Sequence, residues 1–163
     1  MKKQVLLKTM AGLGLALSFS LVTLPSMAQD DHDSHDAHNI ELQLNAGQKW
    51  HTDAPLRQAM RDISLAVNTA LDGIHKKELD AAGYQALAGT VNQQVAYMVE
   101  NCQLEPEADA QLHIVIARLM DSAQVMEKQN DLQVKNEAAV KLVGALNSYA
   151  DYFEDASFVK PVH

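Results

Sequence analysis

Residues 53–76 read DAPLRQAMRDISLAVNTALDGIHK, and the spacing of the apolar side chains in this stretch decides the fold class. The apolar positions recur in alternating steps of four and three, at Leu56, Met60, Ile63, Val67, Ala70 and Ile74. That spacing places them on one face of an α-helix. Thr52 or Asp53 can cap the helix, and Pro55 falls in the first turn, where its missing N–H costs nothing. The stretch therefore predicts an amphipathic helix.

Three further stretches repeat this spacing, the first after Asp80, the second from Pro106 and the third from Asn130 or Asp131. Their apolar stripes run through Tyr84, Ala88, Val91, Val95, Met98 and Cys102, then Ala108, Leu112, Val115, Leu119, Ser122 and Met126, then Leu132, Ala139, Leu142, Leu146, Tyr149 and Phe153. Four helices of about 20 residues with short connections hide such stripes in an antiparallel up-down-up-down bundle. We therefore expect an all-α fold, with a four-helix bundle over residues 53–163.

The first 28 residues have the three parts of a secretory signal peptide. Three lysines form a positive head, an apolar run without acidic residues extends over residues 5–24, and Ser26 and Ala28 are small residues at the cleavage positions. We expect cleavage after Ala28 and a periplasmic location. The alternative is an uncleaved membrane anchor, but the run over residues 10–24 is short for a membrane span. We therefore expect no stable membrane insertion after cleavage.

Residues 29–52 form a tail and a connector. Residues 29–38 read QDDHDSHDAH, with four Asp and three His among ten residues, and such a segment cannot bury enough apolar surface to order itself. We therefore expect a disordered His/Asp-rich tail before the bundle. The connector over residues 39–52 has a weak alternating pattern, which fits a strip lying along the domain as well as a free linker.

Charge and cysteine content exclude several kinds of protein. The chain carries 13 Lys and Arg against 21 Asp and Glu, a formal net charge of −8, and removal of the three lysines before residue 28 leaves 10 against 21, or −11. A negative field argues against a nucleic-acid partner. The single cysteine, Cys102, excludes an intrachain disulfide, a Cys-x-x-Cys pair and an all-cysteine zinc site.

The clearest chemical signal is the tail, where His32, His35 and His38 alternate with acidic residues that include Asp33 and Asp36. Neutral imidazole is the commonest protein ligand for copper, zinc and nickel, and three of them on a flexible acidic segment can wrap one cation. The alternative is a solvated spacer that binds no selected ligand. The spacing of these histidines does not indicate which metal binds.

A second candidate metal site lies at the end of the bundle where the first and third helices start. Met98 and Cys102 lie one turn apart on the second helix, and His51 and His113 fall near the same end. A thiolate and a thioether joined by an imidazole would suit copper. The alternative for Cys102 is a small buried hydrophobe, and for His113 a hydrogen-bonded residue at the edge of the core.

The sequence shows no set of catalytic residues at a recognisable spacing. No helix pair carries the Glu-x-x-His motifs of a di-iron bundle, and the serines have no histidine and carboxylate at a recognisable spacing. We therefore expect a protein that is not an enzyme.

The layout resembles that of periplasmic b-type cytochromes, four-helix bundles that hold haem between a Met near the start of the first helix and a His near the end of the fourth. Met60 matches the first position, but the fourth predicted helix has Tyr149, Tyr152 and Phe153 where the histidine would be. The resemblance implies haem-based electron transfer as a third possibility.

A second resemblance covers most of the mature chain. It rests on the runs at residues 47–50, 53–57, 94–97, 101–102, 106–110 and 112–113. In these runs the chain is similar to a group of small proteobacterial secreted proteins with a His-rich mature amino terminus. The resemblance implies that Trp50, Cys102 and His113 belong to a recurring pattern.

Together these patterns predict a periplasmic protein that buffers, stores or delivers a transition metal, copper first and zinc or nickel next. The alternative is a metal-independent interaction or stress protein whose acidic faces meet another envelope component. We expect a monomer or a weak homodimer, because one chain can satisfy the apolar stripes by itself.

Overall fold

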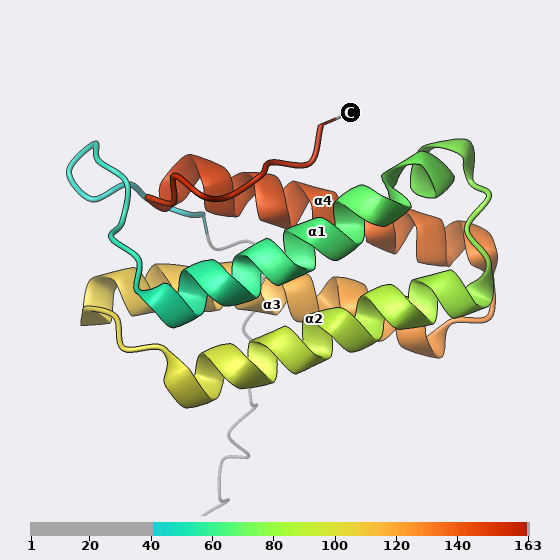
Figure 1. Cartoon of the computed structure of the whole chain (residues 1–163), viewed down its shortest axis with the longest axis horizontal. Helices are drawn as coiled ribbons and strands as arrows, with labels where there is room; N and C mark the ends of the chain where they lie inside the picture. The colour runs from blue at the N-terminus through green and yellow to red at the C-terminus, as the bar shows by residue number, and fades with distance from the viewer. Residues whose placement is uncertain (1–40, 163) are drawn as a thin grey trace, which may run out of the picture. The chain divides into compact units, whose positions relative to one another are not determined.

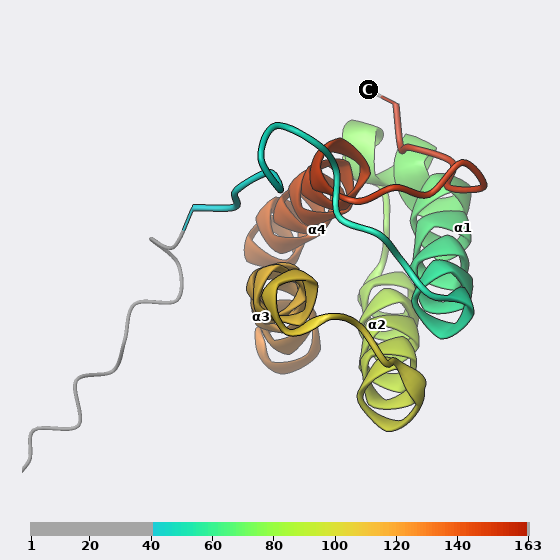
Figure 2. The same ribbon diagram turned by 90° about the vertical axis from the view of Figure 1, so that its left-hand side faces the viewer.

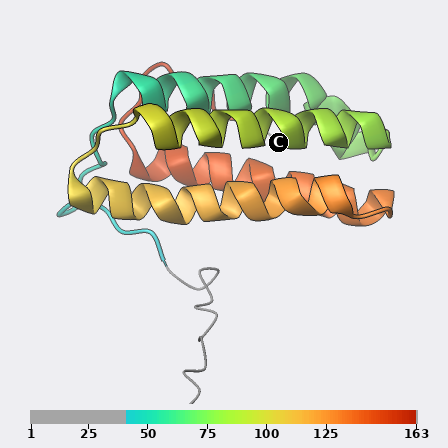
Figure 3. The same ribbon diagram turned by 90° about the horizontal axis from the view of Figure 1, so that it is seen from below.

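The computed structural model describes residues 41–162, which form four α-helices and no strand beyond two isolated bridges. Helix α1 spans Ala54–Lys76, α2 spans Ala81–Asn101, α3 spans Pro106–Lys128 and α4 spans Leu132–Tyr152. Figures 1 and 3 show the helices side by side, with each one running opposite to the helix before it. The all-α four-helix prediction is confirmed. The predicted signal peptide and tail lie outside the described residues, apart from the connector from residue 41 onward.

Aspartates set the starts of three of the helices. Asp53 accepts a hydrogen bond from the backbone N–H of Leu56 at 2.9 Å, and Asp80 and Asp131 cap α2 and α4 in the same manner. Each side chain satisfies a backbone donor that the helix itself leaves unpaired. Helix α3 has no side-chain cap, and begins instead with a proline followed by two acidic residues in its first turn.

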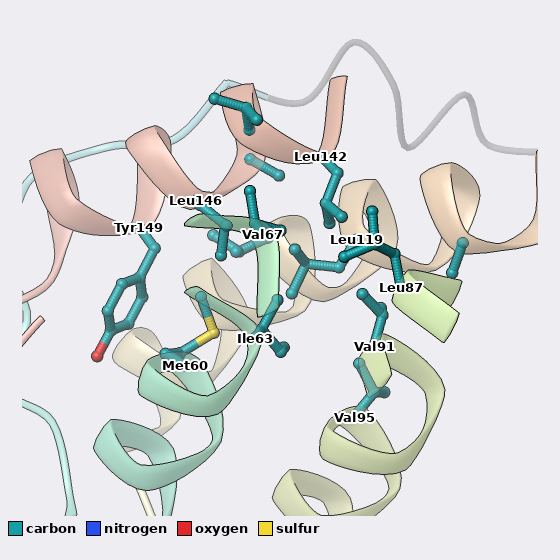
Figure 4. Close-up of a cluster of buried hydrophobic side chains, with 14 of the residues drawn as sticks. Met60, Ile63, Val67, Leu87, Val91, Val95, Leu119, Leu142, Leu146 and Tyr149 are labelled. Atoms are coloured by element: carbon teal, nitrogen blue, oxygen red, sulfur yellow. The ribbon is translucent and has the colours of Figure 1, made fainter. Parts of the chain in front are cut away.

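The core lies along the axis of the bundle, where the four stripes meet. Figure 4 shows side chains of all four helices in it, with Met60 near Tyr149 and Leu119 near Leu142. Full burial of one such side chain contributes roughly 1.5–3 kcal/mol. Helices that follow each other in the chain pack extensively, whereas α1 and α4 pack least among the four neighbouring pairs. No helix within residues 41–162 combines the length and the apolar content that crossing a membrane requires.

The connector is a packed strip rather than a free linker from residue 41 onward. Leu42 is buried, and a tight turn at residues 45–48 joins Asn45 and Gln48 by two backbone hydrogen bonds of 2.8 and 2.9 Å. Ala46 and Gly47 both have positive φ angles, 49° and 86°, a combination typical of type I′ turns. The sequence pattern indicated neither this turn nor its pairing.

The chain leaves the fourth helix within one residue of the end of its predicted apolar stripe, Phe153. The last helix ends at Tyr152, and residues 153–162 are not helical. They run back across α1 and α4, as the two views in Figures 1 and 2 show. We call residues 153–162 the C-terminal strap.

Buried polar side chains of α4 close the end of the bundle that lies opposite to the start of α1. Asn136 donates to the carbonyl of Ile74 at 2.8 Å and to the hydroxyl of Tyr84 at 3.1 Å. The buried ammonium group of Lys135 donates to the carbonyl of Met126. Both carbonyls belong to the last turn of a helix, and that of Ile74 also accepts the backbone N–H of Lys77 at 3.2 Å, so α4 helps to cap α1 and α3.

Candidate site at the first end of the bundle

We call the end with the starts of α1 and α3 the first end, and Figure 2 shows the connector crossing it. The backbone N–H of Trp50 donates to the carbonyl of Tyr152 at 2.8 Å, and the N–H of Glu154 donates back to Trp50 at the same distance. The indole N–H of Trp50 donates to the carbonyl of Gln43 at 2.6 Å, and the N–H of Gln43 donates to the side chain of Gln111 on α3 at 2.8 Å. These bonds fix the connector against the ends of α3 and α4.

Asp53 joins two segments at this end. One carboxylate oxygen caps α1, and the other accepts a 2.7 Å hydrogen bond from the backbone N–H of Gln103, just past the end of α2. The carboxylate also interacts with the thiol of Cys102 and raises its pKa. The start of α1 and the end of α2 are therefore held by a single acidic side chain.

Cys102 is a free, half-buried thiol at the C-cap of α2. Burial, as the largest cause, and the neighbouring charges of Asp53 and Asp109 together raise its pKa from 9.0 to about 12. The thiol is therefore protonated at neutral pH. Since the thiolate is both the metal ligand and the nucleophile of cysteine, this environment makes Cys102 a poor ligand and an unreactive thiol.

The other predicted ligands of the first end do not gather around Cys102. Met98 is buried in the core. His51 has a side chain that is 90% exposed, and its Nδ1 lies 2.9 Å from Glu154 on the strap. His113 is 68% exposed, and its Nδ1 lies 2.9 Å from the backbone oxygen of Asp109, one turn earlier on the same helix.

Across residues 41–162, no three His, Cys, Asp or Glu side chains come together in an arrangement that could hold a metal ion. The bundle would have to rearrange its side chains to use His51, Cys102 and His113 on one ion. The other predicted ligands, His32, Asp33, His35, Asp36 and His38, lie outside the described residues.

The first end also carries a shallow pocket of about 490 Å³. Trp50, His51 and Asp53 line one part of it, and Gln103, Glu105 and Glu107 line another. Three of these six side chains are carboxylates, so the pocket is acidic and favours cationic groups.

Tyr149 is a buried polar residue that the sequence suggested only as a core position. Its hydroxyl donates to a carboxylate oxygen of Asp155 at 3.0 Å, and its ring stacks on Phe153 with centroids 5.3 Å apart. Burial and the negative charge of Asp155 both raise the pKa of Tyr149. The only sequence signal for the bond between Tyr149 and Asp155 was that an aspartate follows shortly after the aromatic residues at the end of the helix.

No family model, curated protein or solved structure matches this chain.

Proposed function

We propose that this chain is a periplasmic transition-metal-binding protein that buffers, stores or delivers copper, or zinc or nickel in second place, without turnover chemistry. The observation that carries the proposal is the tail itself, with histidines at positions 32, 35 and 38 and aspartates between them. Such a segment can supply three imidazoles and nearby carboxylates to one divalent cation without a preformed cavity.

The described part of the chain supports the tail as the binding element in two ways. The first end gathers no set of three ligands, and its cysteine is held protonated beside Asp53. The connector is fixed at this end from Leu42 onward by burial and hydrogen bonds. The bundle thus provides a stable, acidic body to which the histidines are attached.

Metal binding to histidine-substituted chains tests this proposal. The mature chain, purified without an affinity tag, is equilibrated with one equivalent of Cu²⁺ or Zn²⁺, and bound metal is measured by elemental analysis. Replacement of the three tail histidines by Ala should abolish stoichiometric binding, whereas the matched variant with His51→Ala and His113→Ala should retain it. Binding to the unchanged chain should weaken as pH falls through about 6.5, the ordinary pKa of histidine.

Two results would contradict this assignment. If the His51→Ala, His113→Ala variant loses the metal while the tail variant keeps it, the bundle end is the site. If the unchanged chain binds neither copper nor zinc, the metal proposal is wrong.

A second candidate function, a metal-independent interaction protein, is favoured by a groove of about 680 Å³ between α3 and α4. Ser122, Ala138 and Ala145 are buried small residues that line it, and Glu137 and Lys141 lie at its exposed side. A channel lined by small side chains with charges beside it suits an amphipathic helix of another envelope protein.

Gly144 offers a way to test this groove without disturbing the core. A side chain at Gly144, which lines the groove, or at Gly89 on α2 meets no atom within 4 Å at its Cβ position. Gly144→Phe should therefore fill the groove and abolish a specific partner complex, while the control Gly89→Phe should leave it intact. Equal complex formation by both variants would exclude the groove as the interface.

A further inference from the structure

The connector runs along the outer side of α3 and α4 near the first end. The ammonium group of Lys49 donates to the carbonyl of Ala150 on α4 at 2.6 Å. The backbone N–H of Gln43 donates to the side chain of Gln111 on α3 at 2.8 Å, and Leu42, the residue before it, is buried. Figure 2 shows this part of the connector on the side of α3 and α4 that faces away from α1 and α2. The connector therefore covers the first-end part of the seam between α3 and α4.

The groove of about 680 Å³ between α3 and α4 continues this seam. Gln111, which holds the connector, and Arg118, which lines the groove, are two helical turns apart, so they lie on the same side of α3 about 10 Å from each other. Arg118 reaches across the seam to α4, where its guanidinium nitrogen lies 3.5 Å from the hydroxyl oxygen of Ser148. On each helix these are the groove residues nearest to the first end. The groove therefore begins at the contact between Arg118 and Ser148, close to the connector.

The segment before residue 41 is long enough to fill the groove. Trp50 pairs with the end of α4, whereas Gln43 contacts the second turn of α3, so the connector traced backwards moves away from the first end. An extended chain advances about 3.3 Å per residue, and three residues therefore span the distance between the levels of Gln111 and Arg118. Residues 35–40 are then enough to reach the rest of the groove, which extends along α3 to Val125.

The apolar residue of this segment matches the floor of the groove. Residues 35–40 read HDAHNI. In an extended chain every second side chain points to the same face, so Ile40 belongs to the face of the buried Leu42. The groove offers an apolar floor for such a side chain, because Ala138 and Ala145 are buried small residues that line it. Covering Ile40 there removes apolar surface from water, which is favourable.

The charges of the groove also match those of the segment. Arg118 and Lys141 line the groove and suit the carboxylate of Asp36. Asp121 and Glu137 also line it and suit the two histidines of the segment when these are protonated. Positive and negative side chains are therefore balanced along the groove, whereas the whole chain is strongly acidic. The groove attracts an acidic segment that most of the surface would repel.

We propose that residues 35–40 of this chain dock in the groove between α3 and α4 as a continuation of the connector, with Ile40 against the buried alanines. Because the connector fixes one end of the segment beside the groove, its effective concentration is in the millimolar range and weak contacts suffice. The docking needs no metal ion, so it goes beyond the proposed function and does not rest on it. A partner helix, the occupant in the second candidate function, can enter the groove only after this segment leaves.

A disulfide cross-link tests this docking in the mature chain. In a Cys102→Ala background, Ile40→Cys is combined with Ser148→Cys at the first-end edge of the groove, and a glutathione redox buffer containing EDTA oxidises the pair. A disulfide requires Cα atoms within about 7 Å of each other, so its rate of formation reports the docked population. Mass spectrometry and non-reducing gels should show an intrachain disulfide that forms at least tenfold faster than in the control pair Ile40→Cys, Gly89→Cys. Gly89 also has open space at its Cβ position, but it lies on α2.

Filling the groove separates docking from the reach of a tethered segment. Gly144→Phe added to the first pair should slow formation of the disulfide at least fivefold, whereas the matched change Gly89→Phe should leave its rate unchanged. Circular dichroism checks that both variants keep their helices. A rate that Gly144→Phe does not alter, or one no faster than that of the control pair, would overturn the proposal. Disulfide-linked dimers in place of the intrachain product would also overturn it, and would make a second copy the occupant.

Discussion

The two ends of the bundle are closed by different means. At the end opposite to the first, buried Lys135 and Asn136 reach from α4 to the last carbonyls of α3 and α1. At the first end the connector and the strap cross the helix ends, and the polar groups there, such as Asp53 and His51, remain in contact with solvent or with half-buried neighbours. The two ends differ in stability, because the buried hydrogen bonds of the opposite end are costly to break. The ends also differ in chemistry, because the titratable groups of the first end face solvent and can exchange protons and ligands.

The largest effect is expected at the opposite end. Asn136→Ala removes the donor to Ile74 and Tyr84 and leaves both acceptors buried, so the free energy of unfolding should fall by about 2–3 kcal/mol. Urea denaturation measures this difference. Gln133→Ala, an exposed change in the same turn of α4, should stay within about 0.5 kcal/mol of the unchanged chain. Equal losses in the two variants would show that this end is not held by its buried bonds.

A smaller loss is expected at the first end. Asp53→Ala removes the N-cap of α1 and the acceptor for Gln103, and should lower the free energy of unfolding by about 1–2 kcal/mol. Asp53→Asn keeps a capping oxygen and should recover most of that loss. If Asp53→Ala costs as much as Asn136→Ala, the two ends do not differ in the way described above.

The third expectation concerns reactivity at the first end. Asp53→Asn removes a negative charge beside Cys102 and should lower the pKa of the thiol from its value of about 12. The rate of thiol labelling at pH 9 should rise several-fold, because each unit of pKa changes the thiolate population about tenfold. Asp80→Asn, the equivalent cap substitution on α2, should leave the rate unchanged. A labelling rate that Asp53→Asn does not alter would show that the charge of Asp53 does not control the thiol.

The last expectation is a change in stability at alkaline pH. The folded chain holds the proton of Cys102 with a pKa of about 12, above the ordinary 9.0, so this contribution is complete below pH 9 and is lost as pH rises toward 12. The unchanged chain should therefore lose stability in this window more steeply than Cys102→Ala, as thermal unfolding at several pH values would show. Parallel curves for the two chains would contradict the assigned pKa.

The fold was predictable from the sequence because the apolar stripes and three aspartate caps are local patterns. The helix order places Trp50 and Phe153 near the same bundle end, and their pairing there is a finding of the structure. The side-chain contacts were less predictable. Helical spacing places His113 beside the core edge, but its bond to Asp109 on its own helix depends on a rotamer. The link from Asp53 to Gln103 joins residues 50 positions apart, and no local pattern encodes it.

The strap shows a second limit of local patterns. The fourth helix ends at Tyr152, one residue before the end of its predicted apolar stripe, where the backbone of the connector pairs with it. The turn that follows depends on Asp155 binding both Ser157 and Tyr149. Asp, Ser and Pro in one short segment are typical of a turn, but they do not indicate which groove the chain then enters.

The order of packing around the bundle has a consequence for folding kinetics. Three of the four neighbouring junctions join helices that are consecutive in the chain, and only the α1–α4 junction, the least packed, joins its two ends. Contacts between consecutive helices close short loops, so we expect them to form early and the chain to fold rapidly. The α1–α4 junction and its strap then form last. Substitutions there should accelerate unfolding while leaving the folding rate almost unchanged.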